Sequence, residues 1–405
     1  MRVVVWGINY APELTGIAPY NTALCEFLGA RGHEVEMLTT FPYYPTWRKQ
    51  PEDRGRVYRD DVIDGVPVHR CWHYVPAKVA AWKRILHEGT FVLTSTLRAL
   101  SLRRADVYVI VSPPLLLGAA AWLVTKLKES KYVFHVQDLQ PDAAVGLGML
   151  RTGWFTRALY ALEAFSYRHA ARVSGISRGM LSIFERKGVS PQKLIYFPNG
   201  VRLQSSAAHA QRGLFRARHG FAPNEFLAIY SGNLGVKQGL EILIDAAELL
   251  QESAIRVVIC GDGAMRETLA RRVAALKLPN VTMLPLQPMA DYESMLADAD
   301  VCLITQQAGA GNAFFPSKLL STLAAARPVV TVADEESELT RALNEGGFGT
   351  NVAPDDARAL ASALRDLASD PDRRRVYGAA GRAFVEQFEM DRVLSRIAAE
   401  LYEIG

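Results

Sequence analysis

The stretch FLAIYSGNLGVKQGLE, residues 226–241, decides the fold, because a strand pattern restarts there halfway along the chain. An apolar run ends in a glycine turn, and a helical pattern follows it. The same succession opens the chain, where RVVVW at residues 2–6 precedes a glycine turn and a helical pattern over about 18–31. Strands that alternate with helices predict a parallel sheet covered on both faces. Two such series predict an α/β protein with two Rossmann-like domains.

Further strand patterns fill both halves of the chain, with helical stretches between them. They are HEVEMLTT, ADVYVIVS, KYVFHVQD, ARVSGIS and KLIYFPNG in the first half, and IRVVICGDG, NVTMLPL, DVCLI and PVVTV in the second. A polar stretch near residues 202–222, rich in alanine, serine and arginine, separates the two series. Because ligands of such folds lie beyond the carboxyl ends of the strands, we expect a site in the cleft between the two domains.

The composition indicates an ordinary globular protein rather than a nucleic-acid binder. Hydrophobic residues make up 49% of the 405 residues and charged residues 22%. The 46 basic and 42 acidic groups leave a formal net charge of only +4, whereas a nucleic-acid-binding protein is usually more basic. The four cysteines have neither zinc-knuckle nor CxxC spacing, which predicts buried thiols in a reducing compartment.

One apolar run imitates a membrane span. Residues 107–125, VYVIVSPPLLLGAAAWLVT, carry no charge over 19 positions, close to the length that a bilayer needs. Pro113 and Pro114 interrupt the run, as they do where a strand ends and a helix begins with proline. We therefore expect a buried α/β unit. Because MRVVVWGINYAPE has no cleavage site of a signal peptide, the expected location is cytoplasmic.

Two lysines follow corresponding strands of the second half. Lys237 comes after the glycine turn of YSGNLGVKQGLE, and Lys318 opens a helix in FFPSKLLSTLAAARPVV. A lone lysine is usually a solvated charge, and Ser317 could simply cap its helix. Two lysines beside a helix N-terminus, however, suit the two negative charges of a leaving nucleoside diphosphate. We therefore expect Lys237 and Lys318 to be catalytic.

Two glycine turns are weaker candidates for a binding site. In NYAPELTGIAPYN, Gly16 could let backbone N–H groups approach an anion, although a plain strand-to-helix loop explains it equally well. In VICGDGAMRETL, Gly261 and Gly263 could let a base or ribose lie against the backbone, although an ordinary turn also contains such glycines. The chain has no GxGxxG or GxxxxGK[ST] pattern, which disfavours dehydrogenases and P-loop enzymes.

His135 lies near the end of a predicted central strand, in YVFHVQDLQPD. The polar residues Gln137, Asp138 and Asp142 follow it, and the sites of α/β folds lie where strands end. A buried histidine is more often a packing residue than a catalytic one. Both roles stay open for His135.

No metal site is predicted. The DAD at residues 298–300 imitates a metal-binding DxD, but it ends a helix ahead of VCLI, where aspartate commonly serves a turn. No cluster of histidine, aspartate and glutamate has metal-ligand spacing. The chain also lacks a GxSxG nucleophile motif.

Residues 79–100 form an amphipathic helical pattern, and residues 70–104 carry seven lysines and arginines against one acid. The apolar side consists of Trp82, Ile85, Leu86, Val92, Leu93, Leu97 and Leu100. We expect that side to pack on its own domain. The basic surplus, with Lys83 and Arg84 next to Trp82, favours contact of this segment with an anionic membrane or with the acceptor.

These motifs, taken in order, resemble the GT-B glycosyltransferases of family 4, the group 1 retaining enzymes. Among these, the chain is similar to bacterial exopolysaccharide and O-antigen transferases that include colanic-acid fucosyltransferase-like proteins. The resemblance covers nearly the whole chain and rests on YAPELTGIAPYN, LGARGHEVEMLTTFPYYP, HVQDLQPDAA, PNGV, YSGNLGVKQGLE, GDGAMRETL and FFPSKLLSTLAAARPVV. It implies an acceptor-binding domain at 1–201, to which a C-terminal helix at about 386–405 returns, and a nucleotide-sugar-binding domain at 202–385.

The resemblance also implies roles for single residues. Gly16 would lie near the donor phosphates, and His135 would approach the transferred sugar. Lys237 and Lys318 would hold the diphosphate, with Ser317 at the helix start. The other implied donor-binding residues are Asn233, Gly261, Asp262, Pro316 and Leu319.

Three positions depart from the family's pattern. Many relatives carry arginine where this chain has Asn233, and the paired glutamates of an E-x7-E element would fall at Ala313 and Ser321. The second of these glutamates usually binds the donor ribose. The choice between a UDP-sugar and a GDP-sugar therefore stays open.

The resemblance implies an enzyme that moves a hexose from a UDP- or GDP-sugar to a lipid-linked saccharide, with retention of configuration. It implies no metal or other cofactor, and a peripheral location on the inner face of the cytoplasmic membrane. The missing glutamates leave one alternative, a non-catalytic sugar-nucleotide-binding or scaffold subunit. A GT-B sugar-nucleotide epimerase is a second alternative, which the family-4 motifs disfavour.

Overall fold

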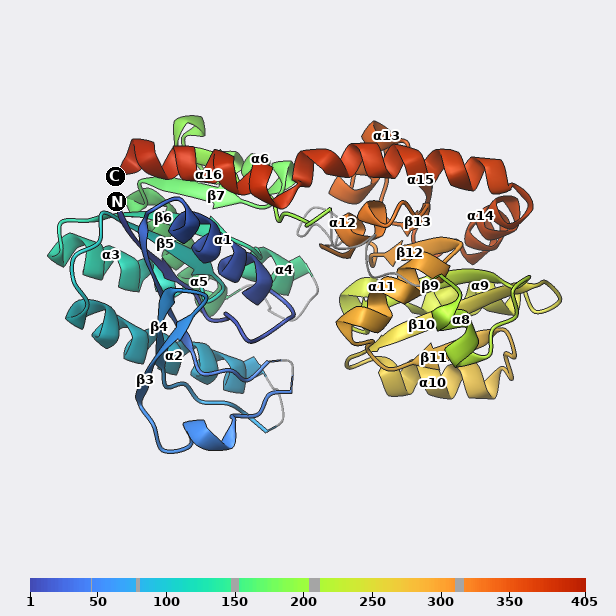
Figure 1. The fold of residues 1–405 in the computed structure, drawn as a ribbon, viewed down its shortest axis with the longest axis horizontal. Helices are drawn as coiled ribbons and strands as arrows, with labels where there is room; N and C mark the ends of the chain where they lie inside the picture. Colours follow the sequence, from blue (N-terminus) through green and yellow to red (C-terminus); the bar gives the residue numbers. More distant parts are fainter. Residues whose placement is uncertain (45, 78–80, 147–152, 204–211, 310–316) are drawn as a thin grey trace. The chain divides into compact units, whose positions relative to one another are not determined.

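The computed structural model describes residues 1–44, 46–77, 81–146, 153–203, 212–309 and 317–405. The chain divides into two compact units. Unit 1 comprises Met1–Asn199 together with Asp391–Gly405, and unit 2 comprises Gly200–Met390. Each unit is an α/β domain built on its own sheet (Figure 1).

Among its described residues, unit 1 contains an eight-stranded sheet in the order β3-β4-β2-β1-β5-β6-β7-β8. The strands are β1 (Arg2–Trp6), β2 (Glu34–Thr40), β3 (Tyr58–Ile63), β4 (Val66–Cys71), β5 (Val107–Ser112), β6 (Lys131–Val136), β7 (Arg172–Gly175) and β8 (Leu194–Tyr196). All neighbours pair in parallel except β3 and β4. The parallel α/β sheet that the strand patterns predict is confirmed.

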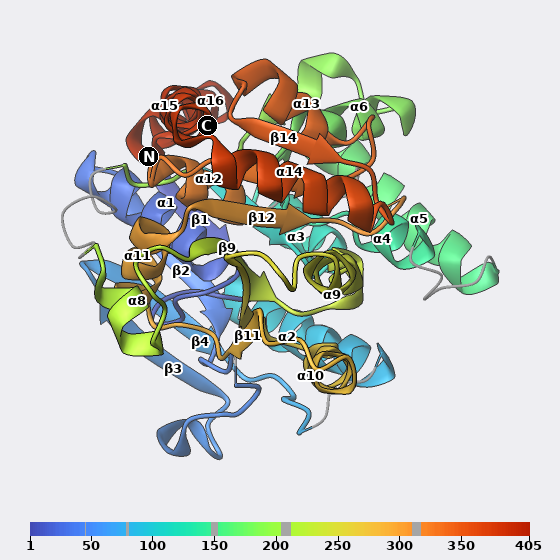
Figure 2. The ribbon, with the colours of Figure 1, turned by 90° about the vertical axis from the view of Figure 1, so that its right-hand side faces the viewer.

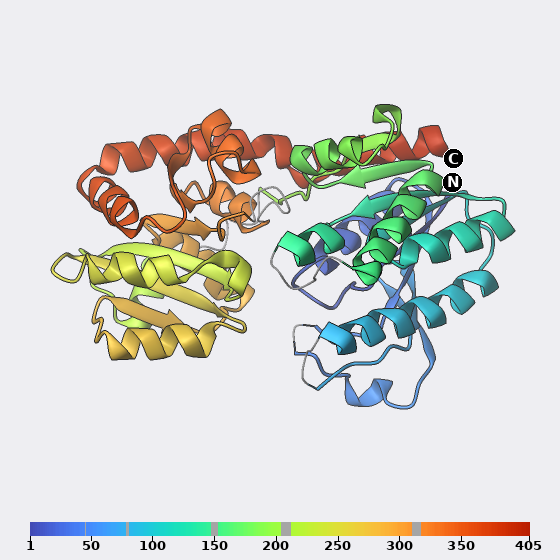
Figure 3. The ribbon, with the colours of Figure 1, turned by 180° about the vertical axis from the view of Figure 1, so that it is seen from behind.

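The helices of unit 1 cover both faces of this sheet. They are α1 (Ala18–Ala30), α2 (Ala81–Ser101), α3 (Leu117–Leu127), α4 (Gln140–Gly146), α5 (Trp154–His169), α6 (Arg178–Arg186) and, from residue 391 on, α16 (Met390–Ile404). Right-handed crossovers place α1 on one face and α2, α3 and α5 on the other, where Figure 3 shows them side by side. Strands and helices share a core that includes Trp6, Phe91, Tyr108 and Phe134.

The strand patterns do not predict the hairpin of β3 and β4. The sequence of β3, YRDDVI, lacks the alternation of apolar and polar residues that marks a half-buried strand. Its charged residues form ion pairs instead. Asp61, for example, lies 2.5 Å from the guanidinium group of the buried Arg70. The signal that could have found the hairpin is Asp64-Gly65, because both residues have the positive φ that a two-residue turn requires.

The apolar run at residues 107–125 forms a strand and a helix of unit 1, as expected, and of its leucines only Leu116 and Leu123 are exposed. Every residue of β5 is buried, and α3 follows it into the core. Within the described ranges, no helix is both long and apolar enough to cross a membrane.

Unit 2 contains, in its described part, a six-stranded sheet in the order β11-β10-β9-β12-β13-β14, and all pairs are parallel. The strands are β9 (Phe226–Asn233), β10 (Ile255–Asp262), β11 (Val281–Leu284), β12 (Val301–Thr305), β13 (Val329–Val332) and β14 (Gly349–Val352). The helices are α8 (Leu214–His219), α9 (Glu241–Glu248), α10 (Arg266–Ala275), α11 (Met289–Asp298), α12 (Ser317–Ala324), α13 (Glu338–Gly346), α14 (Ala357–Ser369) and α15 (Pro371–Val385). Figure 2 shows α9, α10 and α14 on one face of the sheet and α8, α11 and α12 on the other.

The two chain segments that connect the units run side by side. The N–H of Val201 donates a hydrogen bond to the carbonyl oxygen of Phe388 at 2.8 Å. The N–H of Met390 donates one to the carbonyl oxygen of Val201 at 3.0 Å. Gly200 permits this approach, because a Cβ there would lie 2.9 Å from Cα of Met390. The glycine of the PNGV stretch is therefore needed for packing.

Candidate functional site

The candidate residues of unit 2 lie where the strand order reverses. The neighbours of β9 are β10 and β12, and the chain reaches them over opposite faces of the sheet. Such a reversal leaves a crevice for ligands beyond the carboxyl ends of the strands. Asn233 ends β9, Asp262 ends β10, and Lys237 and Lys318 follow β9 and β12. The fold therefore brings the segments of Asn233, Lys237, Asp262 and Lys318 to the carboxyl ends of the strands of one sheet, whereas the predicted Gly16 lies in unit 1.

Lys318 is the second residue of α12, and its ammonium group lies over an aromatic ring. The Nζ atom is 3.7 Å from the centroid of the Tyr230 ring. A Cβ on Gly232 would lie 3.6 Å from the same Nζ atom. Burial lowers the pKa of Lys318 to about 7, and no carboxylate among the described residues opposes that shift. The cation is thus held against a ring face without a carboxylate partner in the described part of the chain.

The glycines at the ends of β9 and β10 have a packing role. A Cβ on Gly261 would lie 1.9 Å from the carbonyl oxygen of Gly232, and a Cβ on Gly263 would lie 2.6 Å from that of Leu234. The close approach of these two segments therefore requires glycine with or without a ligand. This supports the ordinary-turn interpretation, and the donor-binding role of Gly261 stays a prediction.

Asn233 and Asp262 are paired at the ends of their strands and have exposed side chains. The Oδ1 atom of Asp262 accepts a hydrogen bond from the N–H of Gly263 at 2.8 Å, which stabilises the turn. Lys237 lies in a short 3-10 helix, η3 (Val236–Gln238), and its carbonyl oxygen accepts a hydrogen bond from the N–H of Gln307 at 2.8 Å. That bond ties the loop after β9 to the residues after β12.

The start of α12 is described from Ser317 on, whereas Pro316 and Ala313 lie outside the described residues. The side chain of Leu319 is fully buried, so only its backbone could contact a donor. Ser321 stands where the resemblance implies a ribose-binding glutamate. Its hydroxyl group is hydrogen-bonded to a tyrosine of α11 at 2.7 Å, which links the two helices.

Glu13, which the sequence patterns do not single out, organises the carboxyl edge of the unit 1 sheet. Its Oε1 atom accepts hydrogen bonds from the N–H groups of Tyr43 and Tyr44, both at 2.8 Å. Its Oε2 atom accepts one from Nδ2 of Asn9 at 2.8 Å. Burial raises the pKa of Glu13, and these donors oppose the rise. The carboxylate joins the loop after β1, in which the exposed Gly16 has a φ of 68°, to the loop after β2.

Arg70 holds the same loop. Its guanidinium group donates to the carbonyl oxygen of Ala11 at 2.7 Å and to that of Thr40 at 3.1 Å. These partners are 59 and 30 residues away along the chain, and the partners of Glu13 on the loop after β2 are similarly distant. Sequence reasoning therefore missed both residues, because local periodicity carries no information on such contacts. The one available signal was the charge of Arg70 inside the run VPVHRC of β4.

His135 is a buried and uncharged residue of β6. Burial lowers its pKa to about 3, and its ring lies against Phe197 with the centroids 4.3 Å apart. The Nε2 atom of Gln137 donates to Oδ1 of Asn199 at 3.0 Å and to Nε2 of the histidine at 2.9 Å. The histidine proton therefore lies on Nδ1, which is 2.9 Å from Oγ of Ser174. The structure shows the packing role, and the catalytic role stays a prediction.

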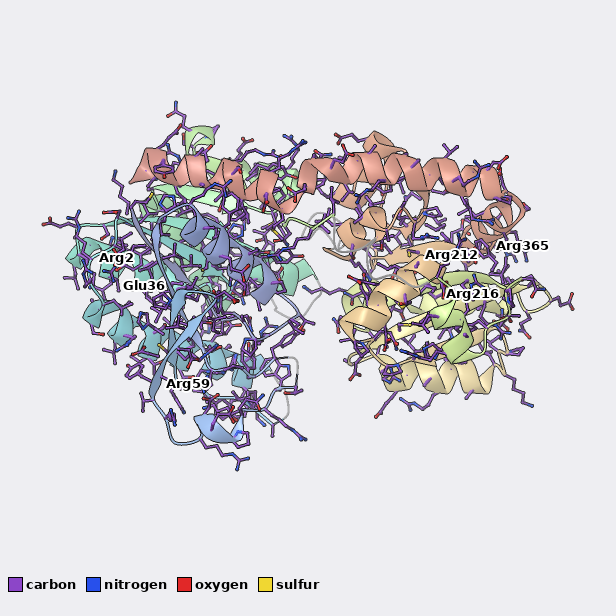
Figure 4. All side chains as sticks on the ribbon, in the orientation of Figure 1. Arg2, Glu36, Arg59, Arg212, Arg216 and Arg365 are labelled. Atoms are coloured by element: carbon purple, nitrogen blue, oxygen red, sulfur yellow. The ribbon has the colours of Figure 1, made fainter. Side chains whose placement is uncertain are left out.

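The aspartates of the DAD stretch hold groups of the protein itself. Asp298 accepts hydrogen bonds from the backbone N–H groups of Gly213 and Arg216 at the start of α8. Asp300 pairs with the side chain of Arg216 at 2.7 Å (Arg216 is labelled in Figure 4) and accepts a bond from the N–H of Leu227. These contacts give the stretch a structural role. The described residues contain no group of three or more potential metal ligands.

The apolar side of α2 is exposed, so the expectation that it packs on its own domain is wrong. The face that meets the sheet carries Phe91, Val92 and Ser95, and Ser95 accepts a hydrogen bond from Nε1 of Trp6 at 3.0 Å. The remaining residues of the predicted apolar side are exposed: Trp82, Ile85, Leu86, Leu93, Leu97 and Leu100. Periodicity shows which residues share a side of a helix, but not which side the rest of the protein covers.

Much of the basic surplus around α2 is paired within unit 1. Arg84 lies 3.1 Å from Glu88, and Arg98 lies 2.5 Å from Asp60. Such surface pairs reduce the charge that this helix alone offers to a membrane. Helix α2 therefore exposes more apolar side chains than the sequence analysis expected. It offers less unpaired positive charge to a membrane than its composition indicates.

Two family models match most of the chain. Residues 15–200 match the glycosyl transferase 4-like domain, and residues 211–384 match the glycosyl transferases of group 1. The chain is 33% identical over 385 residues to WcaI of Escherichia coli (strain K12), which is named as a colanic acid biosynthesis glycosyl transferase. That alignment covers 93% of this chain and 94% of WcaI.

Solved structures share the fold. Sucrose-phosphate synthase (tll1590) from Thermosynechococcus elongatus superposes with a TM-score of 0.78 at 18% identity, over 100% of this chain and 98% of the synthase. Alr3699/HepE of Anabaena in complex with UDP superposes with a TM-score of 0.70 at 15% identity, over 100% of both chains. Together with the two family models, the two Rossmann-like units on separate sheets define the class as the GT-B glycosyltransferases. The chain belongs to the group 1 family of glycosyltransferases.

Proposed function

We propose that this transferase is a retaining hexosyltransferase that moves a sugar from a UDP- or GDP-sugar to a lipid-linked saccharide in bacterial exopolysaccharide biosynthesis. The similarity to WcaI, which is named for colanic acid biosynthesis, supports a role in exopolysaccharide biosynthesis. The similarity to Alr3699/HepE, whose structure contains UDP, supports a nucleoside-diphosphate donor. A lipid-linked acceptor would place the protein on the inner face of the cytoplasmic membrane.

The observation that carries the proposal is the ammonium group of Lys318. Its pKa of about 7 means that the group is poised between its charged and neutral forms. A phosphate oxygen nearby would favour the charged form and raise this pKa. Lys237, on the loop after the adjacent strand, would contact the second negative charge, and the N-terminus of α12 would add its backbone N–H groups.

In the proposed reaction, the acceptor hydroxyl oxygen forms a bond to C1 of the sugar while the bond from C1 to the diphosphate oxygen breaks. Negative charge develops on the leaving diphosphate, where Lys318 and Lys237 stabilise it. Attack from the side of the leaving group retains the configuration, and a diphosphate oxygen takes the acceptor proton. This scheme needs neither a protein base nor a divalent metal. His135, uncharged at neutral pH, would act through its position and hydrogen bonding.

Calorimetric titration of UDP, GDP, UMP and GMP, each without and with Mg²⁺, tests the donor site. We expect one diphosphate to bind more tightly than its monophosphate, independently of Mg²⁺, and Lys318→Ala to lose this binding. The preferred diphosphate would identify the donor base. Binding that requires Mg²⁺, or that survives in Lys318→Ala, would contradict the scheme.

One observation favours a second candidate, a non-catalytic subunit that binds sugar nucleotides. The hydroxyl group of Ser321, at the position of the ribose-binding glutamate, is hydrogen-bonded to Tyr292 of the protein itself. This candidate predicts nucleotide binding without release of free nucleoside diphosphate. An assay of donor hydrolysis, which needs no acceptor, separates it from the enzyme: release of UDP or GDP that Lys318→Ala abolishes would exclude the non-catalytic subunit.

A further inference from the structure

The side chain of Lys318 crosses the end of the unit 2 sheet to reach Tyr230. Helix α12, which carries the lysine, lies on the face of the sheet that α8 and α11 cover (Figure 2). Tyr230 of β9 belongs instead to the core cluster of the opposite face, which includes Ile242 of α9 and Leu360 of α14. The ammonium group, 3.7 Å from the ring centroid, therefore lies where the strand order reverses between β10 and β12.

Gly232 of β9 leaves the space that the lysine side chain occupies. A Cβ at this position would lie 3.6 Å from Nζ and 3.8 Å from Cδ of Lys318, and 3.9 Å from the hydroxyl oxygen of Tyr230. The φ of Gly232 is 144°, a value that favours glycine. The lysine therefore lies along bare backbone, and a larger residue at position 232 would crowd both side chains.

The hydroxyl group of Tyr230 fixes the orientation of the ring. It donates a hydrogen bond to the carbonyl oxygen of Asn233 at 2.8 Å, and burial raises the pKa of the hydroxyl, so it stays a donor. The next residue, Leu234, donates its N–H to the carbonyl oxygen of Asp262 at 2.8 Å. The ring is thus connected to the turns after β9 and β10, and the first of these turns leads to Lys237.

The ring accounts for the position of the ammonium group better than water does. A cation is attracted to the negative face of an aromatic ring, and the attraction grows as the cation loses its water. Lys318 is partly buried, and burial lowers its pKa. A cavity beside the lysine, which Ser231, Tyr292 and Thr322 also line, measures about 10 Å³. That volume is at the lower limit for a single water molecule.

We propose that Tyr230 is a positioning residue of the donor site, whose ring holds the ammonium group of Lys318 at the carboxyl ends of β9 and β12 before a nucleotide binds. A diphosphate then meets a cation that is already in place, so less side-chain freedom is lost on binding. Tyr230 acts through Lys318 and is not itself a catalytic residue. The effect on donor binding rests on the proposed function, whereas the hold of the ring on the lysine does not.

Two variants separate the ring from its hydroxyl group. Tyr230→Phe keeps the ring and removes the hydrogen bond to Asn233, whereas Tyr230→Leu removes the ring and keeps an apolar side chain. Ile259→Ala is the matched control, because Ile259 is fully buried and is paired with Tyr230 across β9 and β10. It opens a cavity in the same core but keeps the ring, so it should lower the Tm as Tyr230→Leu does.

The first measurement is the pKa of Lys318 in the free protein. Lysine labelled with a heavy carbon isotope at Cε reports this pKa in an NMR titration, and Lys318→Ala identifies the resonance. We expect Tyr230→Leu to lower the pKa by about one unit, because the ring no longer favours the charged form. Tyr230→Phe and Ile259→Ala should leave it nearly unchanged, because both keep the ring.

The second measurement is the affinity for the preferred nucleoside diphosphate, determined by calorimetry at neutral pH. Tyr230→Leu should weaken binding about tenfold, because less of the lysine is charged and its ammonium group is no longer held in place. Tyr230→Phe should weaken it less than about threefold, since the ring remains. Ile259→Ala should bind like the wild type despite its lower Tm.

The outcomes separate this inference from the proposed function. An unchanged or raised pKa of Lys318 in Tyr230→Leu overturns the inference, because burial or cavity water would then determine the charge of the lysine. Unchanged diphosphate affinity in Tyr230→Leu, or an equal loss in Ile259→Ala, overturns it as well. A lowered pKa in Tyr230→Leu, in a protein whose wild type binds no nucleoside diphosphate, supports the hold of the ring on Lys318 and contradicts the proposed function.

Discussion

Units 1 and 2 depart from ordinary burial in opposite ways. Unit 1 leaves large apolar side chains of α2, α3 and α5 in water, whereas unit 2 partly buries the side chain of Lys318 and lowers the pKa of its ammonium group. Both arrangements are unfavourable in the isolated chain, since exposed apolar surface costs roughly 25 cal/mol per Å² and a desolvated cation shifts its pKa. In the proposed function, a phosphate of the donor would offset the second arrangement by favouring the charged form of Lys318.

The architecture does not require the apolar surface of unit 1. Helices α9, α10 and α14 of unit 2 cover a parallel sheet in the same manner, yet their described residues include no exposed large apolar side chain. Leu249, just after α9, and Val376, on α15, are exposed at separate places. Two sheets of one fold class thus carry helical layers with different surfaces, and the difference points to a function of the layer rather than to folding.

The strongest test of unit 2 is Lys318→Ala. We expect diphosphate affinity and turnover to fall by about 100-fold or more, because a desolvated charge-assisted contact to the leaving group is lost. Calorimetry and a donor-hydrolysis assay measure the two effects. Lys277→Ala, which removes an exposed lysine of the same unit, serves as the control and should behave like the wild type. Equal losses of affinity and turnover in both variants would show that Lys318 does not contact the diphosphate.

The loop contact of unit 1 is tested by Glu13→Ala. Three N–H donors would lose their acceptor, so the free energy of unfolding should fall by about 1–3 kcal/mol in urea denaturation. Turnover should also fall, because the loop with Gly16 would no longer be tied to the loop after β2. Glu52→Ala, at an exposed position, should leave both quantities unchanged. Full stability in Glu13→Ala would mean that other contacts hold the loops together.

Proton uptake on nucleotide binding tests whether Lys318 of unit 2 becomes charged when the diphosphate binds. At pH 8 the free Lys318 is largely neutral, because its pKa is about 7, and a bound diphosphate should return it to the charged form. Binding should therefore take up close to one proton at pH 8, where the terminal phosphate of the diphosphate is already ionised. Calorimetry in two buffers of different ionisation enthalpy measures the uptake. Lys318→Ala, measured at nucleotide concentrations that restore binding, should show none of it; the same uptake in that variant would assign it to another group.

A gain in stability is also expected when the charge of Lys318 is removed. Burial lowers the pKa of Lys318 from 10.5 in the ordinary case to about 7 in the folded chain. Between these values the unfolded chain binds more protons, so wild-type stability should rise as pH increases from 7 towards 10.5. Lys318→Met should flatten this rise and raise the Tm at pH 7 while it removes diphosphate binding. A lower Tm at pH 7 would show that the ammonium group is stabilised by contacts other than the Tyr230 ring.

The sequence predicted the parts of the fold that depend on local patterns. Strands such as residues 2–6 and 107–112 are apolar throughout because helices cover both faces of a parallel sheet, and the restart at 226 revealed the second unit. Lys237 and Lys318 were found from their places after strands, and the fold does bring their segments to one edge. The hairpin of β3 and β4 was missed, because its strand is stabilised by ion pairs rather than by an apolar stripe.

By itself, the sequence determined the fold class, the two-unit organisation and the segments that carry the candidate donor site, since strand and helix periodicities act over a few residues. Only the tertiary structure decided that Glu13 and Arg70 tie the loop after β1 to distant backbone groups, and that the apolar side of α2 faces solvent. Only the structure also placed the Lys318 ammonium over Tyr230. The physical reason is the same in each case: burial and pairing depend on neighbours from remote parts of the chain.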